Sequence, residues 1–380
     1  MPTFYEFFAG GGMARAGLGD DWECLFANDV DPKKAEAYAQ NWGDEHLVIS
    51  DVNDVATDQL PGRPDLAWAS FPCQDLSLAG AGAGLRGERS GTFWPFWDLI
   101  RSLAVDDRAP SIIVLENVFG AVTSNGGRDF ATLASALSES GFRFGALVMD
   151  AAHFVPQSRP RLFVIGVDSD IEIPDELVGN GPDGPWYPGA LVNALEAVSD
   201  ASGVDPVWWR VPEPPCRGTI LSDLVEDEPA GVDWHSEAQT QYLVSLMTPV
   251  NRAKVEKALA SGQRRVGGVY RRTRQGVQRA EVRLDDVAGC LRTPSGGSSR
   301  LTLLITENGT VRSRLLSPRE GARLMGLPDD YVLPENYNAA YHLVGDGVVV
   351  DVVAHLTRHL LEPVLEARNA HNAPVHVAAA

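Results

Sequence analysis

Residues 3–13 read Thr3-Phe4-Tyr5-Glu6-Phe7-Phe8, then Ala9-Gly10-Gly11-Gly12 and Met13, and they give the first indication of the fold. The apolar run predicts a strand, the glycines predict a tight turn, and a helical pattern begins near Met13. Such a turn lets a ligand approach the backbone and the free N–H groups of the helix start. A tight connection without a ligand would have the same sequence, so the turn alone leaves both interpretations open.

The same alternation of strands and helices continues over the first 170 residues. A helix is expected at 32–42, and further strands are expected at 22–28, 48–50, 66–70, 112–116, 146–150 and 161–167. Strands that alternate with helices favour an α/β fold with a doubly wound, mostly parallel sheet.

The composition changes after Val167. Residues 171–188 and 205–215 are rich in proline, and helical patterns return at 239–246 and 251–260. Ser317-Pro318-Arg319-Glu320 has the pattern of a helix start, and residues 348–367 are apolar with helical spacing. We therefore expect a domain at 1–167, a smaller and irregular domain at 168–310, a C-terminal return at 311–368 and a frayed tail at 369–380.

Composition excludes several classes of protein. With 44% apolar residues among 380, the chain can bury a large core and is not a disordered protein. We expect no membrane-spanning helix and no signal peptide, because long apolar runs and a basic N-terminal segment are lacking. The four cysteines are scattered without metal-ligand spacing, so we expect no metal site and a cytoplasmic, reducing location.

The charge is unevenly distributed along the chain. The formal net charge is −19, yet residues 264–323 hold 13 arginines against five acidic residues, a local surplus of eight positive charges. Such a segment could bind phosphates while the remaining surface stays acidic. A solvated basic patch explains the charge equally well.

Two carboxylates follow the strands next to the glycine turn. Asp29 ends the second predicted strand, where a carboxylate commonly accepts from ribose hydroxyls. Asp51 follows the third strand, where it could accept from an adenine amino group. Together with the turn, these residues indicate a nucleoside cofactor.

Cys73 stands in Phe71-Pro72-Cys73-Gln74, after the fourth strand and before an Ala-Gly repeat at 79–84. A buried, inert thiol is the usual fate of cysteine. This position instead favours a nucleophile, provided that cationic neighbours such as Arg159 and Arg161 lower the cost of the thiolate. The other cysteines (Cys24, Cys216 and Cys290) are expected to lack such neighbours and to be structural.

Glu116 ends another apolar strand, at Glu116-Asn117-Val118. A carboxylate there is costly unless it is paired or functional, and it could protonate a ring nitrogen as general acids do. Alternation places Gln157, Arg159 and Arg161 on one face of the segment before the next strand, where guanidiniums could hold a carbonyl or carboxylate. An ion-paired Glu116 and a surface salt bridge are the simpler alternatives.

Taken in order, these motifs resemble those of the DNA (cytosine-5)-methyltransferases. The resemblance rests on FAGGGM at 8–13, Asn28-Asp29, Asp51, FPCQ at 71–74, ENV at 116–118, QSRPR at 157–161, SPREGARLMGLP at 317–328 and GDGV at 345–348. It covers nearly the whole chain. It implies an S-adenosylmethionine-dependent, Rossmann-like methyltransferase sheet with a target-recognition domain between residues 168 and 310.

The resemblance also implies roles for individual residues. Cys73 would add to C6 of a flipped-out cytosine, Glu116 would protonate N3, and Arg159 and Arg161 would position the base and the carboxylate. S-adenosyl-L-methionine would lie against a set of residues at the strand ends and near the C-terminus. These are Phe8, Ala9, Gly10, Gly11, Gly12, Asp29, Val30, Asp51, Val52, Pro72, Gln74, Asp346, Gly347 and Val348.

Duplex DNA is the implied partner of a monomeric enzyme, and a separately acting cognate restriction endonuclease could accompany it. Arginine can bind phosphates or guanine edges. The candidate DNA contacts lie in the segment after Gln74, in the basic run and in the Gly-Ser loop 293–300. These are Ser77, Arg86, Arg89, Arg264, Arg265, Arg271, Arg272, Arg274, Arg279, Arg283, Ser298 and Arg300.

The sequence departs from the family pattern at Gly345-Asp346-Gly347-Val348, where the family usually has Gly-Asn-Ser/Ala-Val. An Asp there places a negative charge beside the sulfonium, which could tune methyl transfer or indicate a different transferred group. Val30 stands where an aromatic residue is common, so stacking on the adenine would be thinner. An RNA cytosine methyltransferase and an inactive DNA-binding relative are the alternative functions.

Overall fold

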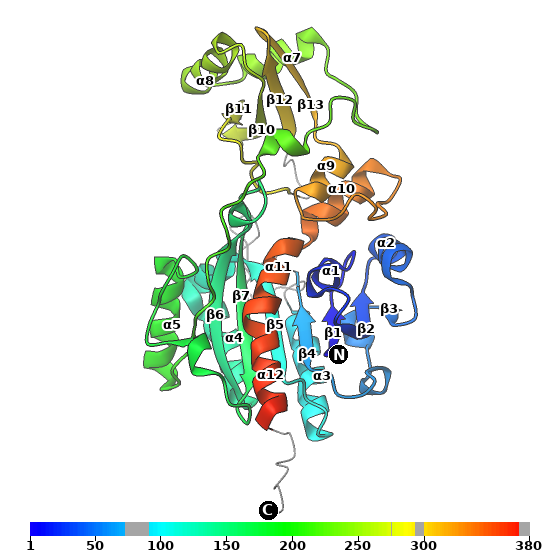
Figure 1. Ribbon diagram of the computed structural model, residues 1–380, viewed down its shortest axis with the longest axis vertical. Helices are drawn as coiled ribbons and strands as arrows, with labels where there is room; N and C mark the ends of the chain where they lie inside the picture. The colour runs from blue at the N-terminus through cyan, green and yellow to red at the C-terminus, as the bar shows by residue number, and fades with distance from the viewer. Residues whose placement is uncertain (73–90, 275, 293–299, 372–380) are drawn as a thin grey trace, which may run out of the picture. The chain divides into compact units, whose positions relative to one another are not determined.

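The computed structural model describes residues 1–72, 91–274, 276–292 and 300–371. The chain forms two compact units (Figure 1). The first comprises Met1–Met149, Pro160–Glu213 and the chain from Val352 onward, and the second comprises Asp150–Arg159 and Pro214–Asp351.

The first unit is built on a seven-stranded sheet of order β3-β2-β1-β4-β5-β7-β6. Its strands are β1 (Thr3–Phe7), β2 (Glu23–Asp29), β3 (Leu47–Ile49), β4 (Leu66–Ala69), β5 (Ile112–Val118), β6 (Phe142–Asp150) and β7 (Pro160–Asp168). From β3 to β5 each neighbouring pair is parallel, whereas β7 runs antiparallel to β5. The expected doubly wound, mostly parallel α/β sheet is therefore confirmed.

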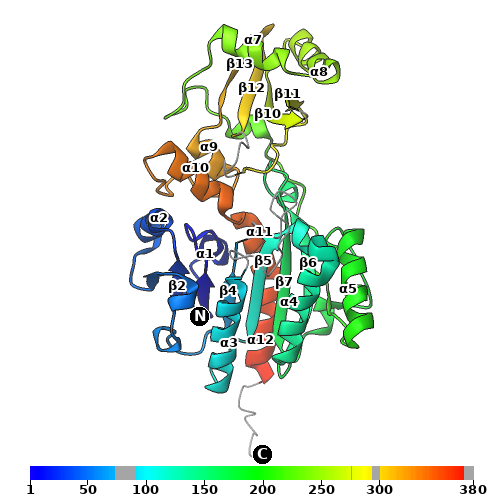
Figure 2. The same cartoon turned by 180° about the vertical axis from the view of Figure 1, so that it is seen from behind.

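Helices cover both faces of this sheet. They are α1 (Met13–Leu18), α2 (Pro32–Trp42), α3 (Phe93–Val105), α4 (Arg128–Glu139), α5 (Gly189–Ser202) and α12 (Glu362–His371). α12 runs along one face in Figure 1, and α3 and α4 lie on the opposite face in Figure 2. Phe93, Phe96, Trp97, Ile100 and Leu103 are spaced to form one apolar face of α3, and all five are buried in the core against the strands.

The second unit is more regular than its sequence indicated. Its antiparallel sheet has the order β11-β10-β12-β13, with β10 (Arg265–Arg274), β11 (Val277–Arg283), β12 (Thr302–Glu307) and β13 (Thr310–Leu315). Its helices are α6 (Leu221–Leu224), α7 (Glu237–Ser245), α8 (Pro249–Ala260), α9 (Pro318–Arg323) and α10 (Tyr337–Asp346). A small core joins α7 and α8 to one face of the sheet through residues such as Leu243, Val255, Val269 and Leu304.

The compact units divide the chain differently from the boundaries suggested by composition. The proline-rich segment after Val167 belongs to the first unit, where β8 (Val178–Gly179) pairs with β9 (Trp208–Trp209). The unforeseen helix α5 explains this, because its Leu191, Leu195 and Val198 are buried in the core of that unit.

The C-terminal helical segment also differs in detail. α11 (Val350–Leu356) is followed by a π-helical turn (Thr357–Leu361) and α12, which continues to His371, while the rest of the expected tail lies outside the described residues. By length and composition alone, the segment Tyr337–His371 could cross a membrane, but 56% of its most apolar stretch is buried within the protein. The predicted start of α9 is confirmed, since Ser317 Oγ accepts from the N–H of Glu320 at 3.1 Å.

Candidate active site

The glycine turn after β1 has a strained backbone that favours glycine. φ is +57° at Gly10 and +75° at Gly12, and Phe8 also has a positive φ of 58°. A Cβ at Gly12 would lie 2.4 Å from Nε1 of Trp42, whereas a Cβ at Gly10 would meet nothing within 4 Å. Gly12 is therefore required for packing against α2, while the space beside Gly10 is open to a ligand.

Asp29 ties this turn to the end of β2. Its Oδ2 accepts from the N–H of Gly10 at 2.7 Å, and its Oδ1 accepts from the N–H of Asp31 at 2.8 Å. The side chain is buried, and that burial raises the pKa of its carboxyl. Each carboxylate oxygen retains a second lone pair, so a ligand hydroxyl could still donate to it.

The sheet order brings the neighbouring strand ends to the same edge. Asp51, after β3, is exposed, and its Oδ1 accepts from the backbone N–H of Asn53 at 2.9 Å. Val52 beside it is buried, Val30 after β2 is 64% exposed, and Pro72 after β4 is half-buried. The buried Val52 and the carboxylates of Asp29 and Asp51 are thus carried by neighbouring strand ends, a set of groups that suits a nucleoside ligand.

Glu6 is a buried acid that the motif analysis did not single out. It lies within β1, is 1% exposed, and accepts weakly from the N–H of Arg15 in α1 at 3.4 Å. Burial raises the pKa of Glu6 to about 8. The sequence does hold a signal for this residue, because Glu6 is a carboxylate inside an otherwise apolar strand, two residues before Phe8.

Glu116 and Arg161 meet at the carboxyl edge of the sheet. Because β7 is antiparallel to β5, β7 begins where β5 ends, and Arg161 is the register partner of Val118. Residues 116 and 118 share one face of β5, and Arg161 Nε lies 3.1 Å from Glu116 Oε1. An ion-paired Glu116, given above as a simpler alternative to a functional carboxylate, is therefore present, with side chains only 15% and 8% exposed.

Asn117 fixes the chain that leads to Cys73, a contact that the sequence did not reveal. Its Nδ2 donates to the carbonyl of Phe71 at 3.2 Å, and its Oδ1 accepts from the N–H of Val118 at 2.9 Å. Cys73 and Gln74 lie outside the described residues. Asn117 thus couples the end of β5 to the backbone just before the predicted nucleophile.

Arg159 and Gln157 belong to the second unit and bind backbone groups there. Arg159 donates to the carbonyls of Gly345 and Gly347 at 2.8 and 2.7 Å, and to that of Leu291 at 3.1 Å. The Nε2 of Gln157 donates to the carbonyl of Leu324 at 2.7 Å. The described contacts of Arg159 thus fasten the turn that follows α10.

The three remaining cysteines differ in their surroundings. Cys24 is buried and Cys216 is exposed, so Cys216 does not have the buried environment of a structural thiol. Cys290 was expected to lack a cationic neighbour, and this was wrong, since Arg159 NH1 donates to its Sγ at 3.2 Å. The error arose because 131 residues separate the two along the chain.

Asp346, the residue that departs from the family pattern, lies at the C-terminal end of α10, in the second unit. Asp346 is exposed, and Gly347 follows it as the cap residue of the helix. Val348 is 4% exposed. Arg159 binds the carbonyls of Gly345 and Gly347, so it holds the backbone on both sides of Asp346.

The candidate DNA contacts of the basic run fall into two groups. Near the base of the β10–β11 hairpin, Arg264 and Arg283 bind Asp227 and Asp285, with closest distances of 2.6 and 2.7 Å. Towards its tip, residues such as Arg272 and Arg279 are exposed. Arg265 lies 3.9 Å from Asp286, and Arg271 is exposed.

Arg300 does not extend freely into solvent. Its guanidinium lies 5.1 Å from the ring centre of Tyr337 and donates to Oδ1 of Asn338, both at the start of α10. The remaining candidates lie outside the described residues, namely Ser77, Arg86, Arg89, Ser298 and the side chain of Arg274.

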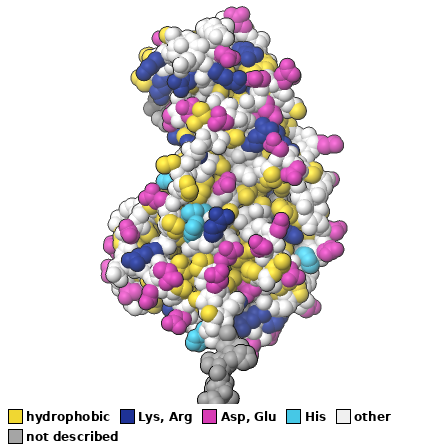
Figure 3. All heavy atoms as spheres, in the orientation of Figure 1, with side chains coloured by type: hydrophobic (Ala, Val, Ile, Leu, Met, Phe, Trp, Pro, Cys, Tyr) yellow, Lys and Arg dark blue, Asp and Glu magenta, His cyan; other side chains and the backbone are white. Residues whose placement is uncertain are grey.

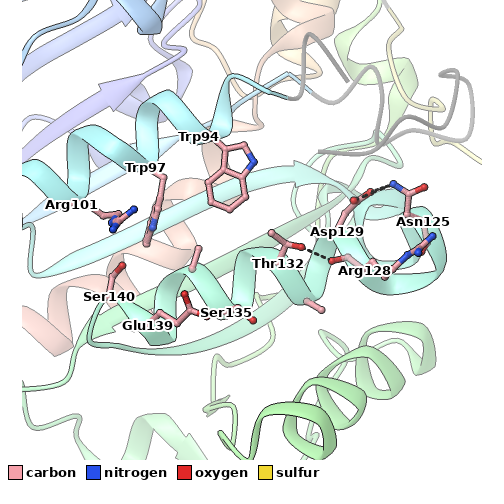
Figure 4. Close-up of a pocket in the computed structure, with 12 residues that line it drawn as sticks. Trp94, Trp97, Arg101, Asn125, Arg128, Asp129, Thr132, Ser135, Glu139 and Ser140 are labelled. Carbon is pink, nitrogen blue, oxygen red and sulfur yellow. Dashed lines mark hydrogen bonds between the residues drawn. The ribbon is translucent and has the colours of Figure 1, made fainter. Parts of the chain in front are cut away.

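A groove of about 980 Å³ lies between α3 and α4 (Figure 4). Trp94, Trp97 and Arg101 form one wall, and Thr132 and Ser135 of α4 face them. Among the candidate site residues that the structure describes, none lines this groove. The residues at the glycine turn and the Glu116–Arg161 pair are therefore separate from this groove.

Residues 2–362 of this chain match the family described as C-5 cytosine-specific DNA methylase. The type II methyltransferase M.BsuFI of Bacillus subtilis is 26% identical over 367 residues, which cover 96% of this chain and 73% of the relative. The type II methyltransferase M.HhaI of Haemophilus parahaemolyticus is 26% identical over 363 residues, which cover 94% and 93%.

Solved structures with the same fold include the Entamoeba histolytica methyltransferase EhMeth. It superposes with a TM-score of 0.60 at 12% identity, covering 95% of this chain and 98% of its own. A DNMT2 mutant of Spodoptera frugiperda gives 0.58 at 17% identity, covering 96% and 100%. At these identities the likeness shows the fold alone.

Proposed function

The chain belongs to the C-5 cytosine-specific DNA methylase family, as its motifs indicated, and from this premise we propose that it transfers a methyl group from S-adenosylmethionine to C5 of a flipped-out cytosine in duplex DNA. The observation that carries the proposal is the Glu116–Arg161 pair, at the same sheet edge as the glycine turn and the loop that leads to Cys73. A carboxylate held by a guanidinium at that edge is suited to bind and protonate a pyrimidine ring nitrogen.

The residues around the glycine turn fit the cofactor. The space beside Gly10 admits the amino-acid part against exposed backbone, and Asp29 can accept from the ribose hydroxyls. Asp51 can accept from the adenine amino group, and Val52 contributes an apolar surface. When bound, S-adenosylmethionine supplies an electrophilic methyl group on its sulfonium.

The protein residues then perform the steps around C6 and C5. The Cys73 thiolate forms a bond to C6 while Glu116 donates a proton to N3, so the C5=C6 electrons become an enamine. The sulfonium of S-adenosylmethionine would supply the methyl group to C5 and depart as the neutral thioether. A base then removes the C5 proton, and the C6–S bond to Cys73 breaks as the C5=C6 bond returns. The proton on N3 goes back to Glu116, so that both the cytosine and the acid are restored. A stacked base could not meet both reactants, which is why the cytosine must be flipped out.

The test is covalent capture on a duplex that contains 5-fluorocytosine, because fluorine at C5 cannot leave as a proton. We expect the protein to form an adduct through Cys73 in the presence of S-adenosylmethionine, and Cys73→Ser to form none while still binding DNA. Cys216→Ser is the matched control, since that thiol is exposed and should be dispensable. Capture by Cys73→Ser at the normal rate would refute the assignment.

Two further measurements address the departure at Asp346 and the nature of the substrate. Mass spectrometry of nucleosides from modified DNA should show 5-methylcytosine, and any other C5 substituent would mean that a different group is transferred. Tritiated methyl uptake should favour duplex DNA over tRNA.

We propose a cytoplasmic location and a separately acting cognate endonuclease, because the relatives M.BsuFI and M.HhaI are described as type II methyltransferases.

A further inference from the structure

Two histidines lie side by side on the C-terminal helical segment of the first unit. His355 is near the end of α11, and His359 lies in the π-helical turn that follows. Their ring centres are 4.5 Å apart, and both side chains are partly exposed. Figure 3 shows His side chains beside a Lys or Arg side chain on the surface over the start of this segment. The pair is therefore accessible to a small ligand from solvent.

The π-helical turn makes the helix irregular at this place. The N–H of Glu362 donates to the carbonyl of Thr357, five residues back, instead of to a carbonyl four residues back. Pro363 accounts for the irregularity, because it has no N–H and its ring would clash with the carbonyl of His359. Single π-helical turns are frequent at functional sites. The residue that faces His355 is thus placed by an irregular turn.

The ring of His355 has a fixed orientation and a fixed tautomer. Its Nε2 lies 2.8 Å from the carbonyl oxygen of Pro212, and because a carbonyl can only accept, Nε2 carries the proton. In the neutral ring, Nδ1 then carries a lone pair. The neighbouring carbonyl of Val211 accepts from Nε1 of the buried Trp186 at 2.8 Å, so the chain that binds His355 is itself held. Metal-binding histidines almost always donate their other ring N–H in this way.

The surroundings favour the uncharged form of both rings. Burial lowers the pKa of His355 and of His359, and the positive charge of Arg358 adds to the effect. Neutral imidazole is the form that binds metal ions. Arg358 is exposed, so its guanidinium can extend into solvent.

The separation of the rings fits a shared metal ion. With a Zn–N bond of about 2.0 Å, each ring centre lies about 3.2 Å from the ion, and an N–Zn–N angle of about 90–110° separates the two centres by about 4.5–5.2 Å. The observed 4.5 Å is the lower end of this range. Among the described residues, no three or more His, Cys, Asp or Glu side chains gather as metal ligands, so water would complete the coordination.

We propose that His355 and His359 form a two-histidine site for a divalent transition-metal ion such as Zn²⁺. Imidazole suits zinc, copper and nickel, and residues four apart share one face of a helix. The sequence signal is the spacing His-x-x-x-His at 355–359. No metal site was expected from the spacing of the cysteines, which does not bear on a histidine pair.

The site lies close to both places where the chain passes between the two compact units. Glu213 ends one segment of the first unit, and Val352 begins the next. The hydrogen bond from His355 to Pro212 already joins these two segments. A metal ion shared with His359 would hold the His355 ring in place, and this bond with it. The site would therefore brace the two crossings and take no part in methyl transfer.

The experiment is calorimetric titration of the untagged full chain with ZnCl₂ in a buffer that does not chelate metals. We expect one Zn²⁺ per chain, with binding lost when either histidine is replaced. His355→Gln and His359→Gln should each weaken it at least about tenfold, since even losing a hydrogen-bond partner of a metal ligand costs 10- to 100-fold. The double variant should bind no more weakly than either single variant, because one imidazole alone cannot chelate.

Two further readouts report on the proposed bracing. Excess Zn²⁺ should raise the unfolding midpoint of the wild type but of neither variant, because a ligand that binds only the folded protein stabilises it. Zn²⁺ should also slow hydrogen exchange at residues 352–362 in the wild type alone. Glutamine at 355 can still donate to the carbonyl of Pro212, so the metal-free variants should unfold close to the wild type.

The controls remove other groups that bind zinc. His46→Gln removes an exposed histidine elsewhere in the first unit, and Cys216→Ser removes an exposed thiol. Both variants should keep the wild-type affinity and stoichiometry. If His355→Gln lowers the metal-free unfolding midpoint, His359→Gln decides the outcome by itself.

Three results would overturn the inference. The first is a wild-type protein that binds no Zn²⁺. The second is Zn²⁺ binding that persists in His359→Gln and disappears in Cys216→Ser, which would assign the metal to a thiol. The third is a wild-type affinity in His359→Gln, which would show that no chelate forms. Methylation of DNA is measured separately, so none of these results bears on the proposed function.

Discussion

Arg161 Nε lies 3.1 Å from Glu116 Oε1. Because β5 and β7 are antiparallel, Arg161 near the start of β7 lies beside Glu116 near the end of β5. The neighbouring β4 and β5 are parallel and end at the same edge. The antiparallel strand next to β5 is therefore what allows a guanidinium on one strand and a carboxylate on its neighbour to meet at the edge where β4 and β5 end.

Replacing Glu116 by Gln should slow the methylation step more than it weakens DNA binding. Gln keeps the shape of the side chain but cannot deliver a proton, and general acid–base groups contribute roughly 10²- to 10⁴-fold to rate. We expect the single-turnover methylation rate of Glu116→Gln to fall within that range while its DNA affinity changes little. Glu139→Gln, at an exposed position of α4, is the matched control and should retain full activity. A Glu116→Gln variant with the wild-type rate would exclude the carboxyl as the acid.

Alanine at Gly12 and alanine at Gly10 should have different consequences. A Cβ at Gly12 collides with Trp42 and Tyr38, so Gly12→Ala should lower the unfolding midpoint of the cofactor-free protein. A Cβ at Gly10 meets nothing, so its cost to folding is that of the left-handed backbone, about 1–2 kcal/mol. Gly10→Ala should instead weaken S-adenosylmethionine binding, because its methyl group fills the open space. Calorimetric binding and thermal unfolding of both variants test this, and equal losses of affinity and stability in the two would contradict it.

Glu6 should make stability depend on pH. Burial raises the pKa of Glu6 to about 8 from a usual value of 4.5, so the folded protein keeps a proton that the unfolded chain releases. As pH rises from about 4.5 to about 8, this group therefore contributes a progressive loss of stability, roughly 1.4 kcal/mol per pH unit at most. Arg15 opposes this effect and Asp29 adds to it.

Unfolding midpoints across that pH range test the contribution of Glu6. In Glu6→Gln the midpoint should fall less steeply with rising pH than in the wild type. The exposed Glu366→Gln should reproduce the wild-type profile. Parallel profiles for wild type and Glu6→Gln would show that this carboxyl is charged in the folded protein.

Arg314 and Glu320 form a fully buried ion pair in the second unit. Both side chains are 0% exposed, and two N–H···O contacts of 2.6 and 2.8 Å join them. Removing one partner leaves an uncompensated charge, which costs about 3–5 kcal/mol. Glu320→Leu should therefore lower the denaturant midpoint strongly, and Arg314→Met/Glu320→Leu should recover part of the loss.

The recovery in that double variant should be incomplete. Glu320 also accepts from the backbone N–H groups of Glu226 and Ser317, each at 2.8 Å, and apolar residues leave these donors unpaired. A double variant less stable than Glu320→Leu would contradict the argument from the buried charge.

Arg159→Lys tests whether this arginine fastens the turn around Asp346. A lysine ammonium keeps the charge but lacks the planar fork that spans Leu291, Gly345 and Gly347. We expect faster hydrogen exchange at residues 343–349 and a raised KM for S-adenosylmethionine with a smaller change in kcat. Arg101→Lys should alter none of these. Unchanged exchange in Arg159→Lys would exclude a positioning role.

Local patterns in the sequence determined much of the first unit. The helix Pro32–Trp42 has the predicted bounds, because Asp31 caps its start and Gly43 follows its end. Strand β1 and the glycine turn follow from an apolar run interrupted by residues that tolerate positive φ. The position of Glu116 at the end of an apolar strand predicted a paired or functional carboxylate, and the structure pairs it with Arg161.

Tertiary structure decided which arginines are available and which are bound. Thirteen arginines in residues 264–323 look alike in a sequence, yet Arg264 pairs with Asp227, 37 positions away, and Arg279 faces Arg272 across a hairpin. The carbonyl partners of Arg159 lie 132 to 188 positions from it. Local propensity is set by neighbours along the chain, whereas the fate of a charged side chain depends on which distant groups the fold brings within a few ångströms.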